Sequence, residues 1–438
     1  MNLQWVWEGR GEAEFQTPEV SSIYEGWKQW SGDMASDISV HAEIFAREIT
    51  QNFVDASREQ NTANAGVIPK LSFEFISLDG QQAVDMRNRM GLQAIAEQYK
   101  TFSDKDLRNL KLPETDFYED VRKLRLLVVR ETGTTGMYGP WARDNRVLDA
   151  NGNRIWRKMR DALLSTVGSK SDVGLGSYGE GKRAIIGASK IRTLFTYTAF
   201  ASSTNAEGVS RRFLGSTYWR AHEVAETAYS GLALLGAKSN NESRPEPLVD
   251  DEADAFVEFL EIPGFEARDA KNPSEFGTTQ VFVDPDIEPG DLASALERNW
   301  WPLLVENKVM LEVSEGEKKW EVSPNSRPEL KQYIEGYLDL KSGSTTHSQT
   351  EIVNISVKNE SLPAGKLALL ADTSDGGWSY ANLETNRSLV ALIREGMIIS
   401  YQMLPKEKAL PAPFVRGVYV VGRDNSAIVE EKLVPGGE

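Results

Sequence analysis

The 438-residue sequence contains no cysteine and only three histidines. Disulfides, thiolate metal sites and cysteine nucleophiles are therefore excluded, and a metal centre built from several histidines is not expected. Long apolar runs are also lacking, because nowhere do about 18 apolar residues follow one another as a membrane-spanning helix needs. The first residues show no basic start followed by an apolar stretch, so no secretory signal is expected. We predict a cytoplasmic protein without a membrane segment.

Basic side chains are in the minority, since 49 lysines and arginines stand against 65 aspartates and glutamates, for a net charge of −16. This charge disfavours sequence-independent binding to nucleic acid and binding to an anionic membrane. Basic clusters at 122–125 and 154–160 could still contact phosphates, although a solvated helix face is the simpler interpretation. The hydrophobic content of 40% is typical of a soluble globular protein, and the length favours two domains.

Apolar periodicity predicts the order of the elements. Apolar residues recur at three- and four-residue steps from Ser39 to about Arg58, which predicts an amphipathic helix. Strands are predicted over 70–76, 123–130, 191–200, 212–218 and 278–283, and helices over 156–167 and from Lys182. After a boundary near 286–290, helices are predicted over 292–299 and 328–338, and strands over 303–313, 351–358, 366–370, 397–404 and 417–421. The predicted fold class is α+β, with domains over 1–286 and 287–438.

A polar stripe on the first helix is the first candidate site element. Glu48, Asn52, Asp55 and Ala56 form the pattern E-x-x-x-N-x-x-D-A. At about 100° per residue, positions i, i+4 and i+7 share one side of the helix. A carboxylate can polarise water, a neutral carboxamide can ligate Mg²⁺, and a small alanine lets a planar ring approach. Alone, such a stripe is more often a solvent-exposed face.

Two further elements lie at strand ends. Arg130–Met137 reads Arg-Glu-Thr-Gly-Thr-Thr-Gly-Met directly after a buried strand, where glycines let backbone amides approach a ligand and Glu131 can accept from an exocyclic amine. Phe276–Thr279 begins a later strand with a hydroxyl that can bond an acidic partner or a base. Each pattern alone is also typical of an ordinary turn.

The fourth element is a glycine-rich loop that opens into a helix at Gly174–Lys182, where free N–H groups and the helix dipole suit phosphate. Gly176, Gly181 and Lys182 also fit G-x-x-x-x-G-K. A P-loop is nevertheless not expected, because Arg183 stands where that motif needs serine or threonine and the preceding segment is polar.

In their order and spacing, the four elements resemble the GHKL ATPase superfamily over roughly residues 40–285. The similarity is greatest to prokaryotic MORC-like ATPases, whose loop reads Gly-Thr-Thr-Gly and whose lid reads Gly-Ser-aromatic-Gly-x-Gly-Lys. Segments 388–399 and 414–419 are similar to the second domain of those proteins. The resemblance implies a Bergerat-type α/β sandwich that binds ATP, followed by a transducer-like α+β domain.

The resemblance also implies roles for particular residues. Glu48 would activate the attacking water, Asn52 would hold Mg²⁺, and Lys182 would neutralise charge on the transferred phosphoryl group. Glu131 stands where the family has an aspartate that reads the adenine amino group, so the base is expected to sit slightly differently or to be read through water. The implied nucleotide-binding residues are Asn52, Asp55, Ala56, Glu131, Gly133, Thr134, Gly136, Met137, Gly174, Gly176, Ser177, Tyr178, Gly179, Gly181, Lys182, and Thr278 or Thr279.

The main functional hypothesis is a Mg²⁺-dependent ATPase switch. ATP binding would close the lid over the phosphates and bring two subunits together, and hydrolysis would release them. A cation of the second domain would reach the γ-phosphate, with Lys341, Lys366 and Arg394 as candidates. The resemblance further implies partner proteins from the same operon, DNA contact through a partner or a local basic patch, and a DNA-linked or phage-defence role.

Other functions stay open from the sequence. A nucleotide-gated scaffold or sensor that does not hydrolyse ATP is one alternative, and a chaperone-like ATPase is another. A histidine kinase is disfavoured, because His41 is the only histidine before Glu48 and no room exists for a phosphoacceptor hairpin.

Overall fold

The computed structural model describes residues 3–10, 40–61, 67–110, 112, 116–141, 156–164, 180–204, 207–239, 244–357, 360–371, 388–403 and 415–421. These residues mix helices and strands, as predicted, and fall into two compact units. The first unit contains the described residues up to Leu292 together with Val309–Glu321, and the second contains Ala293–Lys308 and the described residues from Val322 onward.

One large sheet forms the centre of the first unit. Its main strands, in spatial order, are β1 (Trp5–Gly9), β7 (Thr227–Leu235), β5 (Arg211–Tyr218), β4 (Thr193–Ala199), β9 (Gly277–Val283), β3 (Lys123–Thr132), β2 (Lys70–Asp79), β10 (Met310–Glu315) and β11 (Lys318–Trp320). Two short strands, β6 (His222–Val224) and β8 (Leu248–Val249), pair with β7 and β5. Neighbours pair antiparallel, except that β10 runs parallel to β2.

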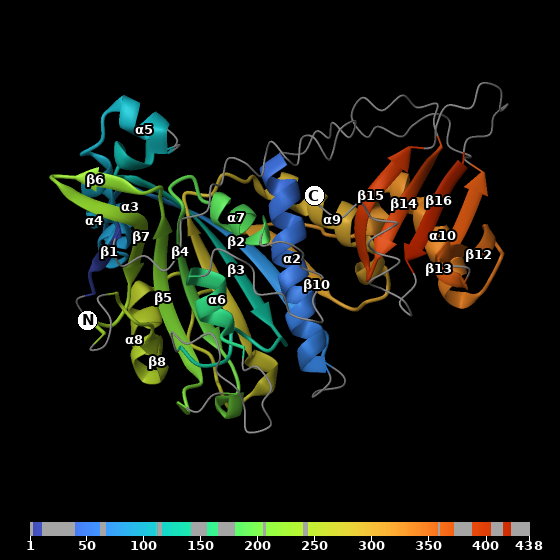
Figure 1. Cartoon of the computed structure of the whole chain (residues 1–438), viewed down its shortest axis with the longest axis horizontal. Coiled ribbons are helices and arrows are strands. Elements are labelled where there is room, and N and C mark those ends of the chain that lie inside the picture. Colours follow the sequence, from blue (N-terminus) through green and yellow to red (C-terminus); the bar gives the residue numbers. More distant parts are fainter. Residues whose placement is uncertain are drawn as a thin grey trace. The chain divides into compact units, whose positions relative to one another are not determined.

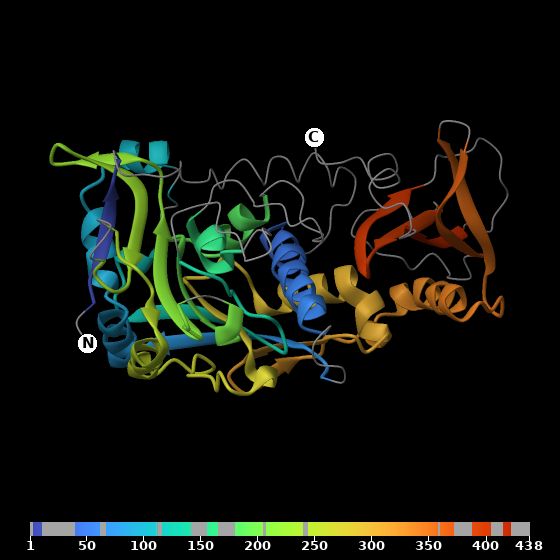
Figure 2. The ribbon, with the colours of Figure 1, turned by 60° about the horizontal axis from the view of Figure 1, so that its bottom comes forward.

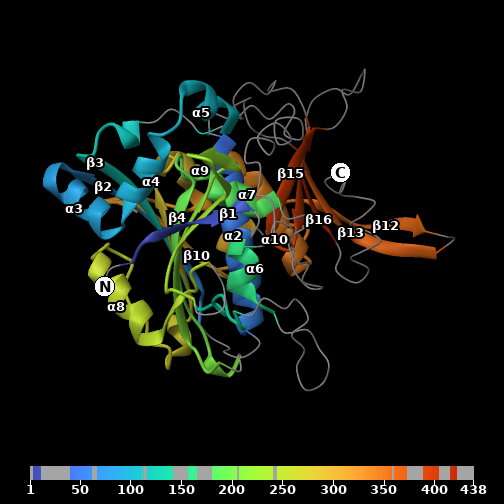
Figure 3. The same ribbon diagram turned by 60° about the vertical axis from the view of Figure 1, so that its left-hand side comes forward.

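Helices cover both faces of this sheet (Figure 3). One face carries α3 (Gly80–Arg89), α4 (Leu92–Tyr99) and α8 (Asp250–Leu260), and the other carries α2 (Val40–Asn61), α6 (Lys158–Leu164) and α7 (Glu180–Gly187). In Figure 1 the last three lie in front of the strands. The helix α5 (Asp104–Leu110) and the 3-10 turns η2 (Asp116–Tyr118), η3 (Ser202–Thr204) and η4 (Pro273–Glu275) complete the unit.

Strand alternation divides the apolar side chains between the two faces. In β3, Leu124, Leu126 and Val128 belong to the core beneath α3, α4 and α8. Because successive side chains of a strand point to opposite faces, Leu127 and Val129 point toward α2. The sheet is therefore apolar on both faces, which explains why the sequence of this strand reads as a continuous apolar run.

The helix predicted from Ser39 to Arg58 is confirmed as α2, which lies across one face of the sheet in Figure 2. Its Phe45 ring packs edge-on against Phe73 of β2 and Phe282 of β9, with ring centroids 6.3 and 5.3 Å apart. Phe45 and Phe53 are each 1% exposed, so the apolar side of this helix anchors it to the sheet. Full burial of such a side chain contributes roughly 1.5–3 kcal/mol.

The single strand predicted over 303–313 is wrong. Leu303–Val305 instead end the helix α9 (Pro289–Val305), and the strand β10 begins only at Met310. Asn307, with φ at 50°, turns the chain between them. An apolar run does not by itself distinguish a buried helix end from a strand, which explains the error. The strand β10 pairs with β2 in the first unit, although it lies after the predicted boundary.

The second unit contains a five-stranded sheet. Its order is β12 (Gln349–Val357), β13 (Glu360–Ala371), β16 (Val415–Val421), β14 (Leu389–Arg394) and β15 (Met397–Met403). The pair β14 and β16 is parallel and the others are antiparallel. The helix α10 (Lys331–Ser342), preceded by η5 (Pro324–Ser326) and η6 (Pro328–Leu330), lies against this sheet (Figure 2). The approach is close at Gly336, where an added Cβ would lie 2.7 Å from Leu370 Cδ1.

Candidate functional site

The predicted polar stripe lies on the least buried side of α2. Asn52 is exposed and Glu48, Asp55 and Ala56 are partly buried, whereas most other residues of the helix are buried. The stripe continues to Glu59 near the end of the helix, which is also exposed. Mg²⁺ commonly takes one or two protein oxygens and completes its shell with water and substrate phosphates. The exposed carboxamide of Asn52 therefore fits the donor chemistry of the predicted metal site.

The loop after β3 is tied to three other elements. The Thr135 N–H donates to the Ala56 carbonyl of α2 at 3.3 Å, and the Thr134 N–H donates to the Phe276 carbonyl at 3.2 Å. The Met137 N–H donates to the hydroxyl of Thr198 in β4 at 2.8 Å. The structure thus brings the predicted Gly-Thr-Thr-Gly loop against the predicted helix stripe at Ala56.

Glycine is required at one position of this loop for two reasons. Gly136 has a φ of +62°, a conformation that side chains with a Cβ rarely adopt. A Cβ added there would also lie 2.3 Å from the Ala199 carbonyl oxygen. The loop therefore presses its backbone onto β4, which fixes the positions of its amide groups.

Glu131 and Thr278 meet where β3 and β9 lie side by side. The Glu131 carboxylate oxygen Oε1 accepts a hydrogen bond from the Thr278 N–H at 2.8 Å. Burial raises the pKa of Glu131 above its ordinary value, while hydrogen bonds from Thr278 and Thr134 and the charge of Arg268 oppose that increase. A partly buried carboxyl held in this way can accept a hydrogen bond from a base.

The sequence left Thr278 and Thr279 as alternatives, and the structure separates them by face. The Thr278 hydroxyl lies 3.2 Å from the Thr198 hydroxyl. It shares the side of β9 on which Phe282 meets α2, since residues i and i+4 of a strand point the same way. The fully buried Thr279 points to the opposite face, where its hydroxyl accepts from Arg268 at 2.6 Å. Thr278 is therefore the threonine on the face of Glu131.

Arg268 is a residue of this region that the sequence did not predict. Its guanidinium donates to the carbonyls of Glu131 and Glu275 at 2.7 and 2.8 Å, besides the hydroxyl of Thr279. Burial lowers the pKa of Arg268 to about 9. The side chain fastens the end of β3 to the start of β9, but Arg268 lies in a loop without a recognisable motif, so no sequence signal pointed to it.

The predicted lid falls largely outside the described residues. This applies to Gly174, Gly176, Ser177, Tyr178 and Gly179. Gly181 and Lys182 lie in the first turn of α7, which begins at Glu180, close to the predicted helix start. The helix α7 packs beside α2 (Figure 1), so the lid is followed by an element in contact with the helix that carries the polar stripe.

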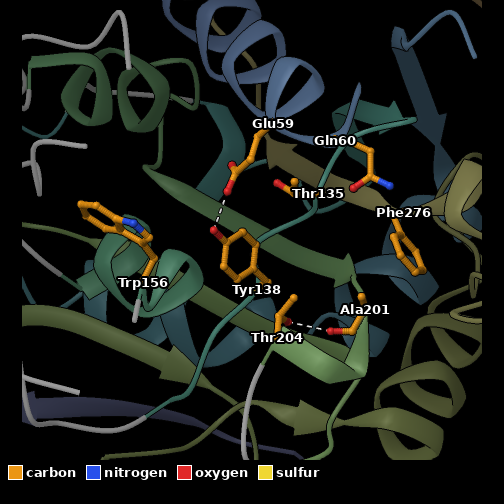
Figure 4. A pocket seen from close by; sticks show the side chains of 8 residues that line it. All are labelled: Glu59, Gln60, Thr135, Tyr138, Trp156, Ala201, Thr204 and Phe276. Carbon is orange, nitrogen blue, oxygen red and sulfur yellow. Dashed lines mark hydrogen bonds between the residues drawn. The ribbon is translucent and has the colours of Figure 1, made fainter. Parts of the chain in front are cut away.

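A pocket of about 330 Å³ opens beside the C-terminal end of α2 (Figure 4). Its lining consists of Glu59, Gln60, Thr135, Tyr138, Trp156, Ala201, Thr204 and Phe276. Thr135 and Phe276 belong to the predicted elements 130–137 and 276–279, but none of the residues named as nucleotide-binding lines the pocket. These eight residues come from five separate segments, which explains why no motif revealed the pocket.

A polar cluster forms one wall of this pocket. The Tyr138 hydroxyl donates to Glu59 Oε1 at 2.5 Å, as Figure 4 shows, and the Lys158 ammonium pairs with the same carboxylate. Burial, together with the hydrogen bond to Glu59, raises the pKa of Tyr138 far above its ordinary value of 10. The hydroxyl therefore stays protonated and acts as a donor.

No family model and no curated protein matches this sequence. The function must therefore be inferred from the residues themselves. Within the described ranges, no group of three or more histidine, aspartate or glutamate side chains is placed to hold a metal ion. In the same ranges, helices long and apolar enough to cross a membrane are absent.

The candidate cations of the second unit differ in their surroundings. Lys341 pairs with Glu306 at 2.7 Å and lies 5.3 Å from the Tyr337 ring centroid. Lys366 is exposed and Arg394 is partly buried. Lys341 is thus engaged inside its own unit, although it is exposed like Lys366.

Proposed function

We propose that the protein is a Mg²⁺-dependent ATPase of the GHKL type that acts as a nucleotide switch. The observation that supports this most directly is the hydrogen bond from the Thr135 N–H to the Ala56 carbonyl. This bond joins the Gly-Thr-Thr-Gly loop after β3, called the glycine loop below, to the polar stripe of α2. Glu48 and Asn52 lie on that stripe, and Glu131 precedes the loop at the end of β3. A helix carrying a carboxylate and a carboxamide, placed against a strand end with a partly buried carboxyl, is the arrangement expected of a Bergerat-type site.

Each residue has a chemical task in this proposal. The bound Mg²⁺ would supply positive charge to the phosphate oxygens, with the Asn52 carboxamide as its protein ligand. Glu48 would orient the attacking water and accept its proton. The amides of 174–181 and the Lys182 ammonium would hold the phosphates. Glu131 and Thr278 would bind the base.

Partners and pathway rest on the resemblance to MORC-like ATPases. In this proposal two subunits associate when ATP binds, in the cytoplasm, together with partner proteins from the same operon in a DNA-linked or phage-defence system. The basic cluster at 154–160 gives little support to direct DNA contact. Arg157 is paired with Asp161 at 2.7 Å, and Arg160, which is 2% exposed, donates to the Trp141 carbonyl.

A nucleotide-gated scaffold is the second candidate, favoured by one observation. Oε1 of Glu131 already accepts the Thr278 N–H, so part of the acceptor capacity meant for the base is used within the protein. Losing or weakening one buried hydrogen bond typically costs about 1–3 kcal/mol, or roughly tenfold or more in affinity. ATP would then bind weakly and turn over slowly.

The test measures phosphate release from ATP with Mg²⁺. On the same samples, the molecular mass in solution shows whether the protein is a monomer or a dimer. We expect the native protein to hydrolyse ATP and Glu48→Ala to do so about 100-fold or more slowly, since loss of a general base typically costs 10²–10⁴-fold. The variant should accumulate as an ATP-bound dimer. Glu97→Ala, at an exposed position of α4 on the opposite face of the sheet, is the control and should behave as native.

The other outcomes decide between the candidates. Binding of ATP without turnover in either protein would favour the scaffold. Equal turnover in native protein and Glu48→Ala would remove Glu48 from the chemistry. Failure to bind ATP at millimolar concentration would exclude both proposals for the isolated protein.

A further inference from the structure

We propose that Arg268 is a positioning residue of the nucleotide site, which keeps the Glu131 carboxyl ionised and in place and so selects a purine with an exocyclic amino group over one with a carbonyl. The inference rests on the proposed function, because it concerns the base of the bound nucleotide. Arg268 is 3% exposed, and its guanidinium donates to carbonyls and a hydroxyl of the protein. Its effect on the ligand therefore passes through Glu131.

The pairing of β3 with β9 ends one residue before Glu131. The last paired residues are Arg130 and Thr279, so a continued antiparallel ladder would next place Glu131 opposite Thr278. Side chains serve the backbone at that position instead. The Thr278 N–H donates to the Glu131 carboxylate at 2.8 Å, and the Glu131 carbonyl accepts from the Arg268 guanidinium at 2.7 Å. The base-recognising carboxylate therefore lies where the ladder ends.

Arg268 binds both strands at this point. Besides the Glu131 carbonyl of β3, its guanidinium donates to the Thr279 hydroxyl of β9 at 2.6 Å. Thr279 directly follows Thr278, whose N–H holds the carboxylate. A guanidinium presents its donors in a rigid plane, so both contacts are kept only at one spacing of the two strands. That spacing sets the place of the Glu131 carboxylate.

The charge of Arg268 favours the ionised form of Glu131. Burial raises the pKa of Glu131 above its ordinary value, whereas hydrogen bonds from Thr278 and the positive charge of Arg268 lower it. Two other charged side chains interact with Arg268, namely Arg130 of β3 and Glu275 of η4, and their opposite signs partly offset one another. The same guanidinium thus acts on Glu131 by contact and by charge.

The neighbouring strand and helix place different groups beside Glu131. On β2 the residue paired with Glu131 is the apolar Leu71. From α2, Asp55 precedes Ala56, whose carbonyl holds the glycine loop. A negative charge on Asp55 favours the protonated form of Glu131, so it opposes the effect of Arg268.

The protonation state of Glu131 decides which purine it recognises. A carboxylate only accepts hydrogen bonds, whereas a protonated carboxyl also donates one. Adenine carries an exocyclic amino group, which donates, and hypoxanthine carries a carbonyl at the same ring position, which accepts. An ionised Glu131 therefore complements ATP and a protonated Glu131 complements ITP. In the wrong pairing, two acceptors face one another.

The first experiment uses the native protein and the β,γ-imido analogues of ATP and ITP, which are not hydrolysed. Calorimetric titration with Mg²⁺ gives the two dissociation constants between about pH 5 and about pH 8. Because both ligands carry the same phosphates, the ratio of the constants isolates the effect of the base. We expect a preference for the ATP analogue of about tenfold or more at the alkaline end, which falls as Glu131 gains a proton.

Glu131→Gln is the control for this titration. The glutamine amide both donates and accepts and has no proton to lose in this range, so its ratio of dissociation constants should not change with pH. A ratio that is equally constant in the native protein would overturn the selection of the base by Glu131.

Substitution of Arg268 separates its charge from its hydrogen bonds. Arg268→Gln keeps donors but removes the charge, so the loss of preference should occur about one pH unit or more higher than in the native protein. Arg268→Lys, which keeps the charge, should restore the native pH dependence. Arg125→Gln removes an arginine near the other end of β3, paired with Glu288, and should behave as native. Equal weakening of both analogues by Arg268→Gln, without a shift in pH, would indicate a merely structural role.

A milder pair of variants covers the case in which Arg268→Gln does not fold. Thr279→Val removes the hydroxyl that accepts from the guanidinium, whereas Thr279→Ser keeps it. At about pH 8 the valine variant should show a preference for the ATP analogue about fivefold weaker than the serine variant, as expected for one lost hydrogen bond. Equal preferences would contradict the positioning role of Arg268.

The outcomes separate this inference from the proposed function. Binding of the ATP analogue with a ratio that depends neither on pH nor on Arg268 would overturn the inference and leave the nucleotide switch standing. Binding of neither analogue by the native protein would overturn both. A shift with Arg268→Gln that Arg268→Lys reverses would support the inference even in a protein that hydrolyses ATP slowly.

Discussion

Two buried arginines fasten the strands and loops around the candidate site. Arg268 joins the carbonyls of Glu131 and Glu275. Arg212, which is 1% exposed, donates to the Gly139 carbonyl at 2.5 Å and pairs with Glu207 at 2.7 Å. A planar guanidinium reaches several acceptors in fixed directions, which a lysine ammonium cannot reproduce. The backbone around the glycine loop therefore depends on side chains that lie outside the predicted motifs.

Glu131 makes stability depend on pH in a defined direction. Because burial raises its pKa above the ordinary 4.5, the folded protein retains a proton that the unfolded chain has already lost. This contribution is fully present below pH 4.5 and is lost as the pH rises through the folded pKa. Glu131→Gln, which has no proton to lose, should gain stability relative to native by about 1.4 kcal/mol for every pH unit between the two pKa values.

Urea unfolding of both proteins between pH 4 and pH 8 measures this difference. Glu97→Gln, at an exposed carboxylate, serves as the control and should follow the native protein at every pH. A constant difference between Glu131→Gln and native across the range would show that Glu131 titrates normally.

At the scale of elements, Gly136 in the loop after β3 and Gly208 in the turn before β5 form a matched pair of substitution sites. Gly136 and Gly208 have φ values of +62° and +69°, but an added Cβ meets the Ala199 carbonyl at Gly136 and nothing within 4 Å at Gly208. Gly208→Ala should cost about 1–2 kcal/mol from backbone strain alone. Gly136→Ala should cost roughly 1–3 kcal/mol more, because the loop must move away from β4.

Chemical denaturation of the two alanine variants compares these costs directly. Equal losses of stability would mean that the loop can move away from the Ala199 carbonyl without a cost in free energy. A larger loss for Gly136→Ala, accompanied by weaker ligand binding, would tie the position of the loop to the site that it borders.

Elements with a strong internal period could be predicted from the sequence, and those defined by distant partners could not. The period of α2 and the apolar run of β3 arise from burial of each element against its immediate neighbours. The five residues of β1 form a strand because Trp5 pairs with Leu235 of β7, a partner that leaves no local signal. The error over 303–313 has a different origin, because the apolar residues Leu303–Val305 end a buried helix and not a strand.

The candidate site likewise contains residues that local motifs predicted and residues that only the fold could place. Its helix stripe and glycine loop were visible as spaced motifs, and the structure brings them together at Ala56. The choice between Thr278 and Thr279 required the register of β9, which no motif encodes. The pocket of Glu59 and Tyr138 depends on segments far apart in the chain, so only the fold could reveal it.

At the scale of the whole molecule, charge governs interaction with nucleic acid. The net charge is −16, and basic residues of both sequence clusters already pair within the protein, as Arg125 does with Glu288 and Arg157 with Asp161. We expect no binding of the isolated protein to a labelled DNA duplex at concentrations of about 1 μM and physiological salt, because Coulomb repulsion exceeds any local attraction. Fluorescence anisotropy measures this, and saturable binding below that concentration would refute it.

The parallel pairing of β10 with β2 has a consequence for the order in which the protein can be completed. Ribosomes deliver β2 long before Met310–Glu315, and α9 must be made in between. Until then β2, a ten-residue strand, lacks its second neighbour and exposes a row of unpaired backbone groups. Such an open edge is a template for association with other nascent chains. Between synthesis of Asp79 and of Glu315, one edge of β2 therefore stays without its native partner strand.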